Sequence, residues 1–294
     1  MPLALSTRWL GARPASPERL LEVLRALDVR ACFVGSGART PEPDPLDRTL
    51  RPAGAKVVGV AAEAFGEVEA GFASRAPEAI GRTVGAARAA AGLGKRLGAR
   101  HVVLRLGRFE LERAKEREGE LLAALRRDGP TEAAREQAAA AAAAVDRRLE
   151  PVLERACRLL FDLCRAEPEI RFAVVTPAGP FELASRRALS LLFDEVRERN
   201  LGYWHDVGAA HLAHQLGLAA PHEWLGDLGA RTFGATLQDA AGADLGLPPG
   251  AGEVDFRAAH EALPSGVPAV LEVDGRFPLA ELKLATSYVR SLGF

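Results

Sequence analysis

The chain has 294 residues, enough to bury a sizeable core and a length that α/β barrels commonly use as one domain. It carries 38 Lys and Arg against 39 Asp and Glu, so it lacks the basic stripe of a nucleic-acid binder and we expect no nucleic-acid partner. No segment has the form of a signal peptide or of a membrane span, which predicts a cytoplasmic protein with no membrane partner.

Short apolar runs alternate with helical segments in the first third of the chain. A strand is expected at 3–7, and the helix after it, 16–28, should begin at Ser16 as N-cap with Pro17 at the first helical position. The Pro-rich stretch 40–52 predicts a loop rather than a full helix. The remaining elements expected in this part are strands at 31–35, 56–62 and 101–107 and a helix at 77–98.

The interval 110–166 is too long for a simple crossover between two strands. It predicts a charged helix, a break at residues 128–130, and a second helical tract from Thr131 whose register Pro151 interrupts. The alanine run 138–144 suits close helix packing or a solvated face. We interpret this interval as a helical elaboration between the fourth and fifth strands, with an interaction role left open.

The rest of the chain returns strand and helix by turns. Strands are expected at 170–176, 202–207, 231–237 and 269–273, with helices at 182–200, 209–217, after 256 and from 279. Eight strand-helix units predict an α/β fold of the (β/α)8 TIM barrel type, forming a single domain over 1–294. Its site should lie at the carboxyl ends of the strands.

The closing half contains four distinctive segments, GYWHDVGAAHLAHQLG (202–217), FGATLQDAAG (233–242), LPPGAGEVDF (247–256) and VLEVDGRFPLAELKLATSYVRSLG (270–293). These segments resemble the xylose isomerase-like TIM barrel family, which contains sugar phosphate isomerases and epimerases. The turn PPGAGEVDF is the most specific of them, and the opening half resembles the family more loosely.

The resemblance implies a divalent metal (Mn, Mg, Co or Zn) held by acids on strands five, six and eight and by a histidine on strand seven. Asp206 and Glu272 match the acids of strands six and eight, whereas Val175 and Thr236 stand where the other two ligands are expected. The resemblance therefore implies a degenerate metal site, with Asp206 and Glu272 as weak metal ligands or, if activity remains, as acid and base. We expect no resident cofactor. His205 should face away from its neighbour Asp206 because side chains alternate along a strand.

Other charged and polar residues are expected near the same mouth. Arg105, in the place of a family histidine, could bind a substrate anion or neutralise Asp206 and Glu272. The further ligand-binding candidates are Glu63, Arg8, Gln238 and Asp239, of which Glu63 and Arg8 could equally be ordinary loop charges.

Three cysteines show no metal-binding spacing. Cys32 lies in an apolar run, and Cys157 and Cys164 are seven residues apart on an expected helix. We predict that all three are buried thiols.

The leading hypothesis is a barrel that binds a small polar, sugar-like ligand, a sugar or sugar phosphate, after erosion of its metal-dependent activity. One alternative is an active metal-dependent sugar isomerase or epimerase that uses Asp206 and Glu272. The other is a non-catalytic protein-interaction barrel with 110–166 as the partner surface; a homo-oligomer is left open.

Overall fold

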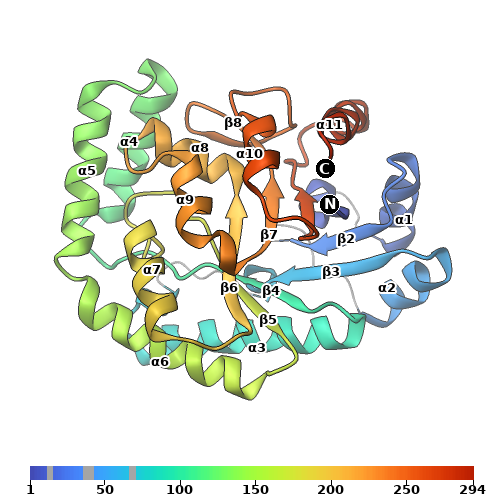
Figure 1. The fold of residues 1–294 in the computed structure, drawn as a ribbon, viewed down its shortest axis with the longest axis horizontal. Helices are drawn as coiled ribbons and strands as arrows, with labels where there is room; N and C mark the ends of the chain where they lie inside the picture. The colour runs from blue at the N-terminus through green and yellow to red at the C-terminus, as the bar shows by residue number, and fades with distance from the viewer. Residues whose placement is uncertain (12–15, 36–42, 66–70) are drawn as a thin grey trace.

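Eight parallel strands close into a barrel (Figure 1), as the sequence predicted. The computed structural model describes residues 1–11, 16–35, 43–65 and 71–294. Around the barrel the order is β1-β10-β7-β6-β5-β4-β3-β2, so the first strand pairs with the last and the ring closes. The strands are β1 Leu3–Ser6, β2 Ala31–Val34, β3 Lys56–Ala61, β4 His101–Leu104, β5 Arg171–Val175, β6 Leu201–Asp206, β7 Thr232–Leu237 and β10 Ala269–Leu271.

Helices surround the barrel and a small hairpin follows β7. The hairpin strands, β8 Asp239–Ala241 and β9 Asp244–Leu247, pair antiparallel. The helices are α1 Pro17–Ala26, α2 Pro43–Leu50, α3 Pro77–Leu97, α4 Ala114–Asp128, α5 Glu132–Asp146, α6 Leu149–Ala166, α7 Arg186–Glu195, α8 Val207–Gln215, α9 Pro221–Leu228, α10 Phe256–Ala262 and α11 Leu279–Ser291. None of the helices in these ranges is both long and apolar enough to cross a bilayer.

The prediction of a loop at 40–52 is wrong from residue 43 onward, because α2 occupies Pro43–Leu50; residues 40–42 lie outside the described ranges. Prolines in the first turn of a helix remove no intrahelical hydrogen bond, so they do not prevent it from forming. Leu46 and Leu50, one turn apart, are both buried in the core beneath the helix. Burial of this apolar pair therefore outweighs the loop signal of the prolines.

The barrel interior is packed around one large side chain, Trp204. It is fully buried, and its indole N–H donates a hydrogen bond of 2.9 Å to Thr236 Oγ1. On the neighbouring strand a Cβ at Gly234 would come within 2.2 Å of the indole ring, so the glycine makes room for it. The other buried members of this cluster are Ala4, Ala31, Phe33, Ala61, Val103, Ala173, Val175 and Val270.

The interval between β4 and β5 forms three helices, α4, α5 and α6, two of which lie at one side of the barrel beside α8 (Figure 1). The helix is interrupted between α5 and α6, just before Pro151, which lies in the first turn of α6. The alanines of α5 pack closely rather than forming only a solvated face. The apolar cluster there consists of Leu121, Leu125, Ala134, Ala138, Leu212, Leu216 and Ala243, from α4, α5, α8 and the hairpin turn.

Candidate functional site

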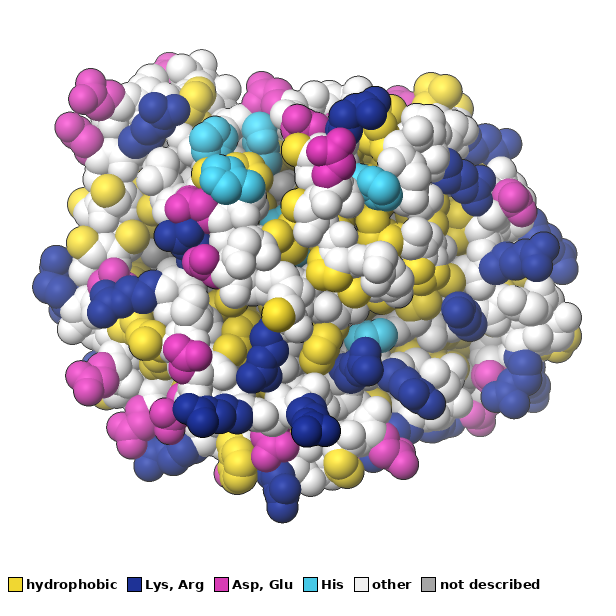
Figure 2. Space-filling view, viewed as in Figure 1, with side chains coloured by type: hydrophobic (Ala, Val, Ile, Leu, Met, Phe, Trp, Pro, Cys, Tyr) yellow, Lys and Arg dark blue, Asp and Glu magenta, His cyan; other side chains and the backbone are white. Residues whose placement is uncertain are grey.

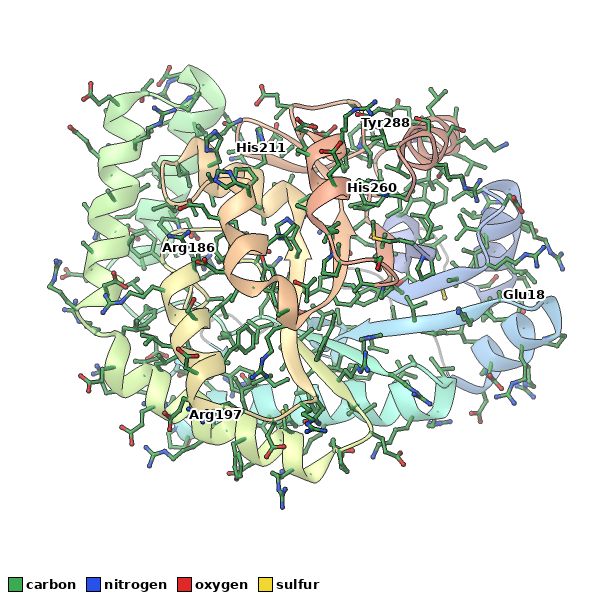
Figure 3. All side chains as sticks on the ribbon, viewed as in Figure 1. Glu18, Arg186, Arg197, His211, His260 and Tyr288 are labelled. Atoms are coloured by element: carbon green, nitrogen blue, oxygen red, sulfur yellow. The ribbon has the colours of Figure 1, made fainter. Side chains whose placement is uncertain are left out.

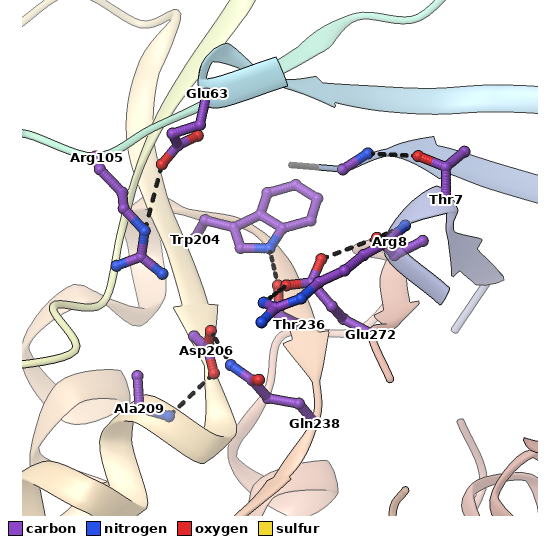
Figure 4. A network of polar contacts seen from close by, with 12 residues as sticks. Thr7, Arg8, Glu63, Arg105, Trp204, Asp206, Ala209, Thr236, Gln238 and Glu272 are labelled. Atoms are coloured by element: carbon purple, nitrogen blue, oxygen red, sulfur yellow. Dashed lines mark hydrogen bonds and ion pairs between the residues drawn. The ribbon is translucent and has the colours of Figure 1, made fainter. Parts of the chain in front are cut away.

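Polar side chains gather where the barrel strands end. Along a strand every second side chain points the same way, so a residue two positions beyond an inward-facing core residue also points inward. Arg105 follows Val103 and Glu272 follows Val270 in this manner, whereas Glu63 lies in the 3-10 turn Ala62–Phe65 that follows β3. We call the barrel mouth the group made of Ser6, Arg8, Glu63, Arg105, Glu182, Asp206, Gln238 and Glu272, most of which Figure 4 shows.

Glu272 receives donors on both of its carboxylate oxygens. The Ser6 hydroxyl donates to Oε2 at 2.9 Å, and Arg8 Nη1 donates to Oε1 at 3.2 Å. Gly35, at the end of β2, leaves the space for this contact, because a Cβ there would lie 2.3 Å from Ser6 Oγ. The acid that matches the family's strand-eight ligand is thus held by an arginine and a serine.

Asp206 is also engaged at both oxygens. Oδ1 accepts the N–H of Ala209 at 3.0 Å, which makes Asp206 the N-cap of α8, and Oδ2 accepts from Gln238 Nε2 at 2.6 Å (Figure 4). Burial raises the pKa of Asp206, although the bonds from Ala209 and Gln238 and the charge of Arg105 oppose the shift. The side chain is 2% exposed and serves first as a helix cap.

Arg105 pairs with two glutamates. Its Nε lies 3.3 Å from Glu63 Oε1 and its Nη1 lies 3.6 Å from Glu182 Oε2. Burial lowers the pKa of Arg105, but the carboxylates of Glu182 and Glu63, and more weakly those of Asp206 and Glu272, raise it overall. Burial raises the pKa of Glu63, against the effect of Arg105. Arg105 therefore forms ion pairs with Glu63 and Glu182 at close range and interacts more weakly with the charges of Asp206 and Glu272.

Sequence reasoning did not single out Glu182. It lies in the connection between β5 and α7 and also accepts the backbone N–H of Ala178 at 2.9 Å. A signal was available, because Glu182 is an acid between two apolar residues, Phe181 and Leu183, and both of these are buried.

Val175 and Thr236 stand where the resemblance places the other two metal ligands, and neither offers a free atom to a metal ion. Val175 faces the barrel interior with its apolar side chain, and the hydroxyl of Thr236 already accepts the indole N–H of Trp204. Within the described ranges no three His, Cys, Asp or Glu side chains are grouped so as to hold a metal ion. Hard divalent cations require about six oxygen ligands, and the carboxylates of Asp206 and Glu272 already accept protein hydrogen bonds. The divalent metal that the resemblance implies does not fit this donor set, and we derive no step through it.

Gln238 and Asp239 are neighbours in sequence, but their side chains make different contacts. Gln238 points to the barrel mouth, where its amide N–H₂ binds Asp206; its Oε1 is buried without a hydrogen-bond partner among the described residues. Asp239 is 1% exposed and lies behind the mouth. Its carboxylate accepts four backbone N–H groups at 2.8 to 3.0 Å, those of Ala240, Gly250, Gly252 and Val254. It therefore organises the PPGAGEV turn.

The closed parallel barrel with polar side chains at its strand ends is a TIM barrel, and solved structures with this fold match nearly the whole chain. The 3-keto-D-glucoside 4-epimerase YcjR from E. coli has a TM-score of 0.69 at 9% identity, with 99% of each chain covered. D-psicose 3-epimerase from Clostridium cellulolyticum H10, solved with D-tagatose, gives 0.70 at 10%, with 99% of each chain covered. The IolI protein, solved with a zinc atom, gives 0.69 at 15%, covering 99% of this chain and 96% of that one.

No family model and no curated protein matches the sequence. At these identities the structural matches establish the fold. They agree with the resemblance that the closing segments of the sequence indicated.

Proposed function

We propose that the barrel mouth binds a small neutral polyol, a sugar or a compound like one, without a divalent metal. The single observation that carries this proposal is the pairing of three acids of the mouth with arginine side chains. Glu272 pairs with Arg8, and Glu63 and Glu182 pair with Arg105, so guanidinium groups stand where a cation would otherwise be needed.

The charge of the mouth supports a neutral ligand. Four carboxylates against two guanidinium groups give the described part of the mouth a formal charge of −2 when all are ionised. A phosphate would be repelled by such a set, whereas the hydroxyl groups of a sugar can donate to carboxylate oxygens. A neutral sugar is therefore preferred to a sugar phosphate.

A second candidate function is proton transfer on such a ligand by an isomerase or epimerase that uses Asp206 and Glu272. One observation favours it: burial raises the pKa of Asp206, and carboxyls with raised pKa values are suited to act as general acids or bases. In this case Asp206 would hold the proton at Oδ2, after release of Gln238, and Glu272 would act on the opposite side of the ligand.

A ligand screen with the purified protein tests the proposal. Neutral pentoses, hexoses and cyclic polyols, together with the matching sugar phosphates, are screened by saturation-transfer NMR and thermal unfolding, with and without EDTA. A neutral compound should bind and raise Tm, the phosphates should bind more weakly, and EDTA should leave both results unchanged. Arg105→Gln should weaken binding about tenfold, because it leaves Glu63 and Glu182 without their partner.

Two results would contradict the proposal. One is that the protein binds one equivalent of a divalent metal and that its removal by EDTA lowers Tm. The other is that no neutral compound binds. The catalytic candidate has a separate readout. Incorporation of deuterium from D₂O into a bound sugar, lost in Asp206→Asn, would support it.

A further inference from the structure

A cavity of about 370 Å³ lies outside the barrel, between α8, α9 and the start of α10. Four of the six histidines of the chain line it, namely His205, His211, His214 and His222. Figure 2 shows histidine side chains gathered on this face over α8 and α9, and Figure 3 labels His211 there. The barrel mouth contributes no residue to this cavity, so the two are distinct places on the molecule.

His205 forms the floor of the cavity. It is 2% exposed and points outward from β6, on the face opposite to that of its neighbour Asp206. Nδ1 contacts the hydroxyl of Tyr203 at 3.0 Å. Nε2 has no hydrogen-bond partner among the described residues, and it is not fully buried. The small exposed part of this ring therefore includes Nε2, which opens into the cavity.

The hydrogen bonds behind His205 favour one of its two ring nitrogens as the carrier of the proton. Tyr203 also contacts Thr176 Oγ1 at 2.6 Å, and the Thr176 hydroxyl lies 3.4 Å from the carbonyl oxygen of Trp204. Burial lowers the pKa of His205 to about 3, so the ring is neutral and holds one proton. Each proton finds an acceptor when His205 Nδ1 donates to Tyr203, Tyr203 to Thr176, and Thr176 to Trp204. This assignment leaves Nε2 as an unused acceptor.

Apart from Glu253 and Asp255, the rest of the cavity wall is apolar. Its buried part includes Val207 and Leu225, and its outer part includes the side chains of α10. Ligand sites are typically apolar cavities of roughly 300 to 1,000 Å³ with a few placed polar groups. The apolar remainder of the lining is Pro221, Val254, Ala258, Ala259 and Ala262.

We propose that this cavity is a second binding site, which takes a small molecule with an apolar ring and a hydroxyl group. The ring packs between Leu225 and the alanines of α10. The hydroxyl donates to Nε2 of His205, while the three less buried histidines of the lining, His211, His214 and His222, flank the entrance.

Phenol is the probe for the test, and toluene is its counterpart without a hydroxyl. Titration of the full-length protein, followed by ¹H–¹⁵N NMR, should show saturable phenol binding on the order of millimolar, with the largest shifts in α8, α9 and α10. Toluene should bind about threefold to tenfold more weakly, the effect of one hydrogen bond. The ¹⁵N shift of His205 Nε2 should be that of an unprotonated nitrogen and should move when phenol binds.

Two variants separate binding from folding. Ala258 lines the cavity but is exposed, so Ala258→Trp should fill the site and abolish phenol binding while Tm stays unchanged. Ala140→Trp, at an exposed position of α5, is the matched control and should bind phenol normally. Equal binding of phenol and toluene, phenol shifts located elsewhere, or unchanged binding in Ala258→Trp would each overturn the proposal. Zn²⁺ binding that broadens the His205 signal and excludes phenol would identify a metal site instead.

Discussion

Arg8 and Glu272 form an ion pair of 3.2 Å that joins the first and the last strand of the barrel at its mouth. Arg8 follows β1 and Glu272 follows β10, and these two strands close the ring through the register Leu3 to Ala269. The pair therefore links the two ends of the fold at the place where a ligand would enter. Its acid is one of the two, Asp206 and Glu272, that the sequence offered as metal ligands.

Removal of Arg8 should destabilise the protein modestly. In Arg8→Gln the Glu272 carboxylate, 14% exposed, keeps only the hydroxyl of Ser6, and we expect a loss of about 1 kcal/mol, smaller at high salt because Arg8 is one-third exposed. Urea unfolding at low and high ionic strength measures it. Arg19→Gln, which removes an exposed pair with Glu22, is the control and should leave stability unchanged.

Asp206→Asn should change how stability depends on pH. Because burial raises the pKa of Asp206 above its ordinary value of 3.8, the folded protein binds this proton more tightly than the unfolded chain does. Stability from this group therefore falls as pH rises from 3.8 through the raised pKa, and the asparagine variant escapes that loss. In urea unfolding, the stability of the variant relative to the wild type should therefore increase as the pH rises above about 4. A difference that stays flat with pH would contradict the assignment.

Asp206→Ala should cost more than the asparagine variant at every pH. It removes the N-cap of α8 and the partner of Gln238, so we expect a loss of about 1 to 2 kcal/mol. The same unfolding experiment measures it, with hydrogen exchange of the Ala209 amide as a local readout.

Gly234→Ala should be strongly destabilising, because its Cβ would lie 2.2 Å from the ring of Trp204 in the filled barrel interior. We expect a loss of about 3 kcal/mol, together with a shift in Trp fluorescence. Gly85→Ala is the matched control, since Gly85 lies in α3 with open space around it. That substitution should stabilise the protein by about 0.5 to 1 kcal/mol.

Asp239→Ala should loosen the turn that its carboxylate organises. Four backbone N–H groups lose their acceptor, and we expect a loss of about 2 to 4 kcal/mol. Hydrogen exchange should accelerate at Gly250, Gly252 and Val254, the amides bound across the turn. Unchanged protection at these amides would show that the carboxylate is not needed for the turn.

The three cysteines should resist alkylation in the native state. Burial raises the pKa of Cys32 to about 12, that of Cys157 to about 11 and that of Cys164 to about 12. Iodoacetamide at pH 8 reacts with the thiolate, so labelling should follow unfolding rather than precede it. Rapid labelling of folded protein, detected by mass spectrometry, would contradict the burial.

The barrel could be predicted from the sequence because its signal is repeated. Eight apolar runs alternate with helical patterns. Each apolar run must be buried on both faces, and a parallel barrel covered by helices provides this burial. The helix α2 was missed because three prolines, at 41, 43 and 45, dominate the local pattern, while the burial of Leu46 depends on helices that are distant in sequence.

The mouth could be predicted only as a set of positions. Strand alternation places Arg105, Asp206 and Glu272 at the ends of inward-facing rows, and the structure has them there. Their partners could not be read from the chain. The pairing of Arg105 with Glu182 depends on the path of the loop after β5, and the choice of Arg8 for Glu272 depends on the closure of the ring.

The double engagement of Asp206 has an evolutionary consequence. An aspartate that starts a helix and anchors a glutamine amide is useful to the fold whether or not a cation ever binds near it. Such an acid can therefore persist through its structural role alone. A lone aspartate at the sixth strand end is for that reason a poor marker of metal-dependent chemistry in barrels of this shape.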